Sequence, residues 1–173
     1  MKRRGVVAGA LAVATAGCVD RIHDVAASTP RDIDVRSRYV GTDPLIESES
    51  IVSATAGAET HARAYTAAAD ATAVTVTEAD AVHEFIAGTA FVDDGGEAVL
   101  LVVQRLAPPS LDLRLGSVSR TRTHALRIAV DEVGTRHEDD PVVHTLLLRL
   151  TDGRGPPERI TVSVGGDRTS VTV

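Results

Sequence analysis

Large aromatic side chains are almost absent from the sequence. It contains two Phe, two Tyr and no Trp among 173 residues. Sites that hold nucleic-acid bases, sugars or quaternary amines against rings depend on such side chains, so the composition argues against those ligands. The core must instead be filled mainly by Val, Leu, Ile and Ala.

Lysine and asparagine are also scarce. Lys2 is the only lysine beside 17 arginines, and there is no asparagine. The acidic residues outnumber the basic ones, which gives a formal charge of −6 and predicts no nucleic-acid partner. An acidic, lysine-poor composition is typical of proteins that must stay soluble in concentrated salt, where carboxylates repel one another little. A GC-rich genome is the alternative explanation of the arginine bias.

No apolar run is long enough to cross a membrane. Lys2, Arg3 and Arg4 precede an uncharged stretch of thirteen residues, Gly5 to Gly17. As a helix it would span about 20 Å, short of the roughly 30 Å hydrocarbon core. The pattern predicts a signal peptide over residues 1–17, with Arg3 and Arg4 as its export signal. The arginine pair is similar to twin-arginine signals, and the general secretory route is the alternative.

The only cysteine, Cys18, directly follows Ala16 and Gly17. This junction resembles the lipobox of lipoproteins, in which the cysteine is lipidated and becomes the mature N-terminus, although Thr15 stands where the bacterial pattern prefers Leu. A lone cysteine cannot form an internal disulfide. The resemblance implies lipidation of Cys18, and the alternatives are an ordinary cleavage site or a buried thiol. Removal of residues 1–17 changes the formal charge from −6 to −9.

The signal, the acidic body and its Val/Thr-rich style together resemble haloarchaeal lipoproteins. In the body, the residues that carry the resemblance to these lipoproteins are Phe85, Thr89 and Phe91 and the segment from His144 to Leu150. The resemblance implies a lipid anchor on the outer face of the cell membrane, and it implies no activity. We expect residues 18–30 to form a lipidated N-terminus and tether, and residues 31–173 to form a single β-rich domain.

Alternating apolar residues predict strands throughout the second half of the chain. The segment 98–104 is a continuous apolar run, typical of a strand buried on both faces. Period-two alternation follows in the segments 111–115, 126–130, 144–150 and 160–164. Gly165 and Gly166 then predict a tight hairpin before the segment 169–173.

The first half gives weaker signals. Alternation over 33–40 predicts a first strand. We expect a helix within 54–69, the alternative being a loop with short strands at 51–52 and 74–76. Thr77 followed by Asp80 fits an N-terminal cap for a short helix that ends near Ile86.

Six expected strands after residue 97 and one or two before it indicate a mainly β protein. We predict an antiparallel β-sandwich, immunoglobulin-like at most, with one or two short helices in the N-terminal half. An open barrel is the alternative.

One cluster has the composition of a metal site. His137, Asp139, Asp140 and His144 supply nitrogen and oxygen ligands for a divalent cation, the only cofactor that the sequence suggests. The alternative is an ordinary acidic loop between strands. We therefore expect a lipid-anchored surface protein that binds or scaffolds, and the second hypothesis is a cation- or solute-binding receptor.

Other candidate motifs are incomplete. His83 and Glu84 begin a zinc-protease pattern, but Ala87 stands where its second histidine is required. The acidic segment 93–97 lacks the ligand spacing of a calcium loop and predicts a turn. Arg120, Arg122 and Arg127 form a basic patch only if they are not paired with carboxylates, and we expect such pairing.

Overall fold

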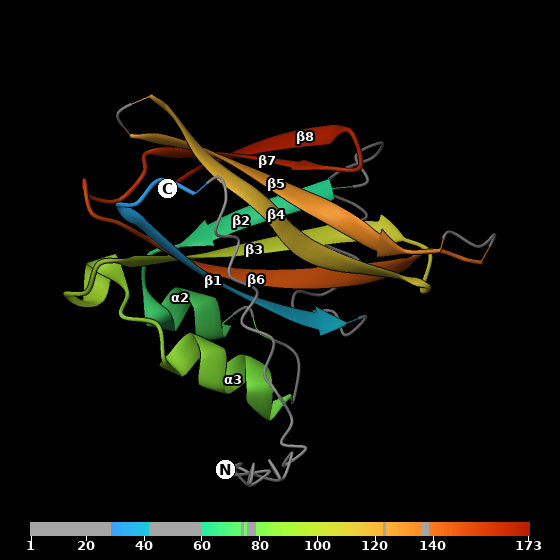
Figure 1. Ribbon diagram of the computed structural model, residues 1–173. Coiled ribbons are helices and arrows are strands. Elements are labelled where there is room, and N and C mark those ends of the chain that lie inside the picture. Colours follow the sequence, from blue (N-terminus) through green and yellow to red (C-terminus); the bar gives the residue numbers. More distant parts are fainter. Residues whose placement is uncertain (1–28, 42–59, 74, 76–78, 123, 136–138) are drawn as a thin grey trace, which may run out of the picture.

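The structure is a computed structural model, and it describes residues 29–41, 60–73, 75, 79–122, 124–135 and 139–173. In this part of the chain, eight strands form two four-stranded sheets, accompanied by two short helices and a 3₁₀ turn (Figure 1). The elements are β1 (Ile33–Gly41), β2 (Thr60–Tyr65), α2 (Ala68–Ala73), α3 (Asp80–Ala87), η1 (Val92–Asp94), β3 (Ala98–Ala107), β4 (Leu111–Arg122), β5 (Ala125–Gly134), β6 (Val142–Asp152), β7 (Arg159–Val164) and β8 (Asp167–Thr172). The predicted mainly β sandwich is confirmed.

The two sheets have different strand orders. Sheet A has the order β1-β6-β3-β2, and sheet B has the order β4-β5-β7-β8. Neighbouring strands are antiparallel except for β5 and β7, which run parallel. The predicted antiparallel sandwich therefore has one exception among the described strands, the parallel pair of β5 and β7. After β5 the chain crosses to sheet A as β6, so it returns to sheet B as β7 in the direction of β5.

The main hydrophobic core lies between the two sheets. Alternate residues of each strand point into it, as the period-two patterns predict. Sheet A contributes Val99, Leu101, Val103, Leu146, Leu148 and Leu150, and sheet B contributes Leu113, Leu115, Leu126, Ile128, Val130, Ile160, Val162 and Val164. Each of these side chains is at most 4% exposed, so the core is almost dry.

A second apolar cluster covers the outer face of sheet A. Leu100, Val102 and Leu147 point away from sheet B and pack with Val82 and Ile86 of α3. The helices therefore form a third layer beneath sheet A (Figure 1). This layer explains why β3 is a continuous apolar run, since both of its faces are buried.

The expected helix within 54–69 is wrong over residues 60–65, and among the described residues of the range only the last two, Ala68 and Ala69, are helical. Residues 60–65 form β2, which pairs antiparallel with β3, and α2 begins only at Ala68. Buried and more exposed side chains alternate along most of β2, and pairing with β3 overrides the helix propensity of its alanines. Residues 54–59 lie outside the described part.

The helix expected to end near Ile86 is present as α3. Its N-cap is Ala79, which makes no side-chain cap hydrogen bond, and the proposed cap Thr77 lies outside the described residues. The predicted hairpin between β7 and β8 is confirmed, because Gly165 and Gly166 have φ angles of 55° and 97°. None of the described helices is long and apolar enough to span a membrane.

Candidate functional site

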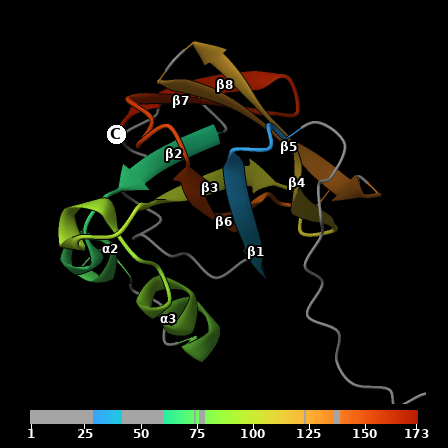
Figure 2. The ribbon, with the colours of Figure 1, turned by 60° about the vertical axis from the view of Figure 1, so that its left-hand side comes forward.

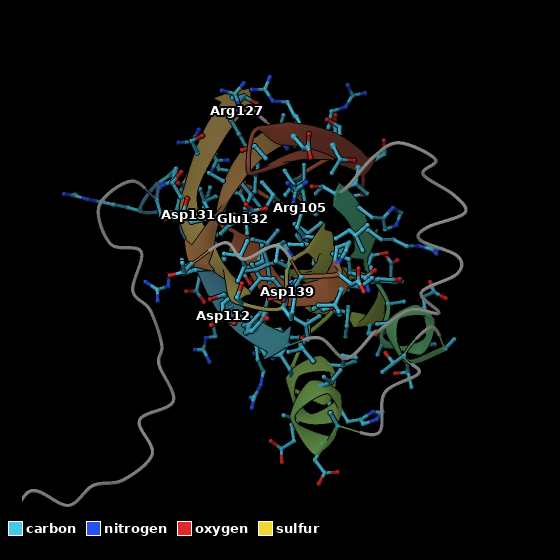
Figure 3. All side chains as sticks on the ribbon, turned by 90° about the vertical axis from the view of Figure 1, so that its right-hand side faces the viewer. Arg105, Asp112, Arg127, Asp131, Glu132 and Asp139 are labelled. Carbon is cyan, nitrogen blue, oxygen red and sulfur yellow. The ribbon has the colours of Figure 1, made fainter. Side chains whose placement is uncertain are left out.

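Most of the residues singled out in the sequence are not brought together by the fold. Arg3, Arg4, Cys18 and His137 lie outside the described residues. Asp139 and Asp140 are exposed ahead of β6, whereas His144 is completely buried within β6. Figure 3 shows Asp139 at the end of the sandwich.

His144 is not available as a metal ligand in this arrangement. Its Nδ1 lies 2.7 Å from the Tyr39 hydroxyl, and its Nε2 lies 3.0 Å from the Pro108 carbonyl oxygen. The carbonyl can only accept, so Nε2–H donates to it, and the Nδ1 of the neutral ring accepts from Tyr39. Both ring nitrogens are therefore occupied, which corrects the sequence interpretation of this residue.

The rest of the metal hypothesis has no support from the described part of the chain. No three His, Cys, Asp or Glu side chains there lie close enough to hold a metal ion. The acidic segment 93–97 is a turn, as expected: Asp93 accepts a hydrogen bond from the Thr66 hydroxyl, and Asp94 accepts one from the backbone N–H of Ala68. These carboxylates stabilise the start of α2.

A buried arginine links the sheets at one end of the sandwich. The side chain of Arg105 on β3 is only 3% exposed, and its Nε lies 2.8 Å from a Glu132 carboxylate oxygen on β5. Its Nη1 donates to Asp167 on β8 and, at 2.9 Å, to the Thr60 hydroxyl. Burial lowers the pKa of Arg105, but the hydrogen bonds to Asp167 and Glu132 outweigh it, so the pKa is raised. Figure 3 shows Arg105 beside Glu132.

A second arginine links the sheets at the opposite end. Arg120 on β4 makes a bidentate contact with Asp152 of β6, at 2.6 and 2.9 Å, and lies 3.1 Å from Asp32. The Asp152 side chain is 2% exposed, and its Oδ1 also accepts from the backbone N–H of Arg154. The expected pairing of Arg120 with carboxylates is confirmed. Its fork geometry fits the carboxylate, which favours a structural role.

Arg149 is different, because it is partly buried without a carboxylate partner. Its Nη2 donates to the Phe85 carbonyl oxygen at 2.6 Å, its Nε donates to Thr89 at 3.0 Å, and its guanidinium lies 4.7 Å from the centroid of the Phe85 ring. No described carboxylate is within ion-pair distance of it. Burial lowers its pKa, and the nearby charge of Arg36 lowers it further, against the opposing effect of Asp34.

Arg149 lines a hollow of about 640 Å³ between β1, β4 and α3, which we call the β1 groove. This volume is within the usual range of ligand sites. Its lining residues are Val35, Arg36, Ser37, Arg38, Tyr39, Glu84, Phe85, Gly88, Asp112, Leu113, Arg114, Leu146 and Arg149. Figure 2 shows β1 at the edge of sheet A, above α3.

The β1 groove carries positive charge in an acidic chain. Four arginines line it against two carboxylates, those of Glu84 and Asp112. Burial raises the pKa of the Tyr39 phenol, and Asp112 raises it further, so this hydroxyl keeps the proton that it donates to His144. The positive charge, together with the partly buried side chains of Val35 and Phe85, makes the groove suited to an anionic ligand with an apolar part.

Inspection of the sequence alone missed the β1 groove. Arg149 follows three leucines and occupies the apparent solvent face of an alternating strand, and nothing nearby in the sequence indicates that α3 covers that face. The one usable signal was the excess of arginine over lysine. Comparison of the chain with family models, with curated proteins and with solved structures found no match in any of the three.

Proposed function

We propose that this chain is a lipid-anchored binding domain on the outer face of the cell membrane, and that its β1 groove binds an anionic ligand. The observation that carries the binding role is Arg149, a partly buried guanidinium with no carboxylate partner among the described residues. A buried cation is costly unless it is paired, so such a group favours an external anion.

The proposed anchor rests on the sequence from Lys2 to Cys18. A basic start, an uncharged stretch and a small-residue junction before the only cysteine support export followed by lipidation. Two acyl or isoprenoid chains would hold the domain firmly, at about 0.8 kcal/mol per buried CH₂. The net negative charge of the domain fits a position held away from an anionic membrane surface.

The anchor is tested by membrane fractionation of cells that express the chain. The native chain is expected in the membrane fraction, and the Cys18→Ser variant is expected in the soluble exported fraction. Membrane retention of that variant would refute the anchor, as would an unmodified thiol at Cys18 in the mass spectrum of native material.

Ligand binding is tested by thermal unfolding with inorganic phosphate and with succinate, because a ligand that binds only the folded state raises Tm. We expect a rise for the native chain, no rise for Arg149→Ala, and an unchanged rise for Arg127→Ala. Arg127 is the matched control because it is exposed on β5 and does not line the β1 groove. No rise with either anion would contradict the binding role.

A further inference from the structure

The β1 groove follows the open edge of a strand. β1 is the edge of sheet A and pairs only with β6 among the described strands, while β4 is the facing edge of sheet B. The groove is lined by five consecutive residues of β1, from Val35 to Tyr39, and by three of β4, from Asp112 to Arg114. Successive side chains of a strand point to opposite faces, so a hollow that touches consecutive residues must pass along the strand edge.

The two sides of that edge differ in chemistry. On the side of α3, Arg36 lies opposite Arg149 in the β1–β6 register, and Arg38 is the next residue of β1 on that face. On the side of β4, the partly buried Val35 packs against the core, and Leu113 and Leu146 lie behind it in the core, 3% and 1% exposed. A strand laid along β1 would therefore meet a cationic wall with one set of side chains and an apolar wall with the other.

We propose that an extended acidic peptide adds to the open edge of β1 as a further strand of sheet A. This inference rests on the proposed binding function and names the class of partner. The peptide backbone pairs with those N–H and C=O groups of β1 that point away from β6. Its carboxylates face Arg36, Arg38 and Arg149, and the alternate apolar side chains pack on Val35 at the edge of the core.

Charge complementarity favours this occupant over a second copy of the chain. If two β1 strands paired edge to edge, Arg36 and Arg38 of one copy would approach those of the other, and like charges on neighbouring strands are destabilising. Among the described residues, Asp34 is the only carboxylate within ion-pair distance of Arg36, at 3.9 Å, and both side chains are more than 60% exposed. An incoming carboxylate therefore has cations to pair with.

The test uses a short capped peptide in which glutamate and valine alternate, titrated by calorimetry into the whole mature chain. A peptide of the same composition with its glutamates and valines in two blocks is the control for register, and an alternating lysine–valine peptide is the control for charge. We expect the alternating acidic peptide to bind at least about tenfold more tightly than the blocked one. The lysine peptide should show no binding.

Variants of the chain locate the site. Arg149→Ala should weaken binding of the alternating peptide by about tenfold or more, and Arg127→Ala should leave it unchanged. Glu84→Gln should strengthen binding, because it removes a carboxylate from the groove. Since Arg149 also contacts α3, a second variant, Arg36→Ala with Arg38→Ala, tests the cationic wall through side chains of the edge strand itself.

The results distinguish a failure of strand addition from a failure of the anion-binding role on which it rests. Equal binding of the alternating and blocked peptides, or peptide binding that neither arginine variant weakens, would overturn strand addition. If phosphate or succinate raises Tm through Arg149 but no peptide binds, the partner class is wrong and the anion-binding role stands. If light scattering shows a dimer that Arg36→Ala with Arg38→Ala leaves intact and that excludes the peptide, the edge belongs to a second copy.

Discussion

The arginines at the two ends of the sandwich and the arginine of the β1 groove show two uses of the same side chain. Arg105 and Arg120 each reach across from one sheet to carboxylates of the other. Arg149 instead reaches toward α3 and meets only carbonyl, hydroxyl and ring partners. A paired arginine therefore fastens the two sheets to each other, whereas Arg149, without a carboxylate partner, is the arginine to which we assign the proposed ligand.

The largest effect is expected at Arg120. Arg120→Ala leaves the Asp152 carboxylate, 2% exposed, without its cation, and breaking a buried pair costs about 3 to 5 kcal/mol of unfolding free energy. Urea unfolding measures the loss. The double variant Arg120→Met with Asp152→Asn should recover much of it, because no uncompensated charge remains. A loss of unfolding free energy below about 1 kcal/mol would mean that the Arg120–Asp152 pair contributes no more than an exposed surface ion pair.

Arg105→Met should cost less, about 2 kcal/mol. The substitution keeps the apolar volume in the core, and the stranded carboxylates of Glu132 and Asp167 are 14% and 50% exposed, so water can reach them. The same urea experiment checks the order of the two effects. If Arg105→Met lowered the unfolding free energy more than Arg120→Ala, the burial of the carboxylates would not determine which arginine contributes more to stability.

Arg149→Ala should lower the unfolding free energy by about 1 to 2 kcal/mol, because it removes the Phe85 contact and two hydrogen bonds but also relieves the cost of holding a cation without a carboxylate. Its main effect should be on ligand binding. If the stability loss instead matched that of Arg120→Ala, Arg149 would have to be counted among the residues that fasten the fold.

The smallest expected effect is a change in how the unfolding free energy depends on pH under acidic conditions. Burial raises the pKa of Asp32, but its backbone hydrogen bond, Arg154 and Arg120 outweigh this and lower the pKa below its ordinary 3.8. The stability linked to Asp32 is therefore present above pH 3.8 and is lost as pH falls through the lowered pKa. Unfolding free energy measured against pH should fall less steeply in this range for Asp32→Asn than for the native chain. If the curves of unfolding free energy against pH were parallel for Asp32→Asn and the native chain, the charge of Asp32 would not contribute to stability through Arg120 and Arg154.

The sequence predicted the strands well because their signal is local. Leu113, Ile128 and Val162 each lie in a clear alternating segment, and each points into the core as expected. β2 was missed because its sequence has no clear apolar alternation and its stability comes from pairing with β3, which no local pattern records.

The candidate site was missed for a related reason. Arg120 and Asp152 are 32 residues apart, and Arg149 and Phe85 are 64 apart, so spacing in the chain says nothing about their contact. His144 was misassigned because its acidic neighbours in sequence are on the surface while its own ring faces Tyr39, 105 residues away. Asp139, Asp140 and His144 lie close together in the sequence and have the composition of a metal site, but the start of β6 places the carboxylates on the surface and the His144 ring inside.

The position of β6 in the middle of sheet A affects the order in which the domain can assemble. β1 and β3 do not pair with each other, and each lies against one side of β6, which comes after both sheet-B strands β4 and β5 in the chain. During synthesis β1 therefore remains without β6, its only partner among the described strands, until residues 142–152 have been made. Closing contacts of such long separation is slow, so we expect late, concerted folding. A ligand could engage β1 only after that step, which would restrict recognition to the finished domain.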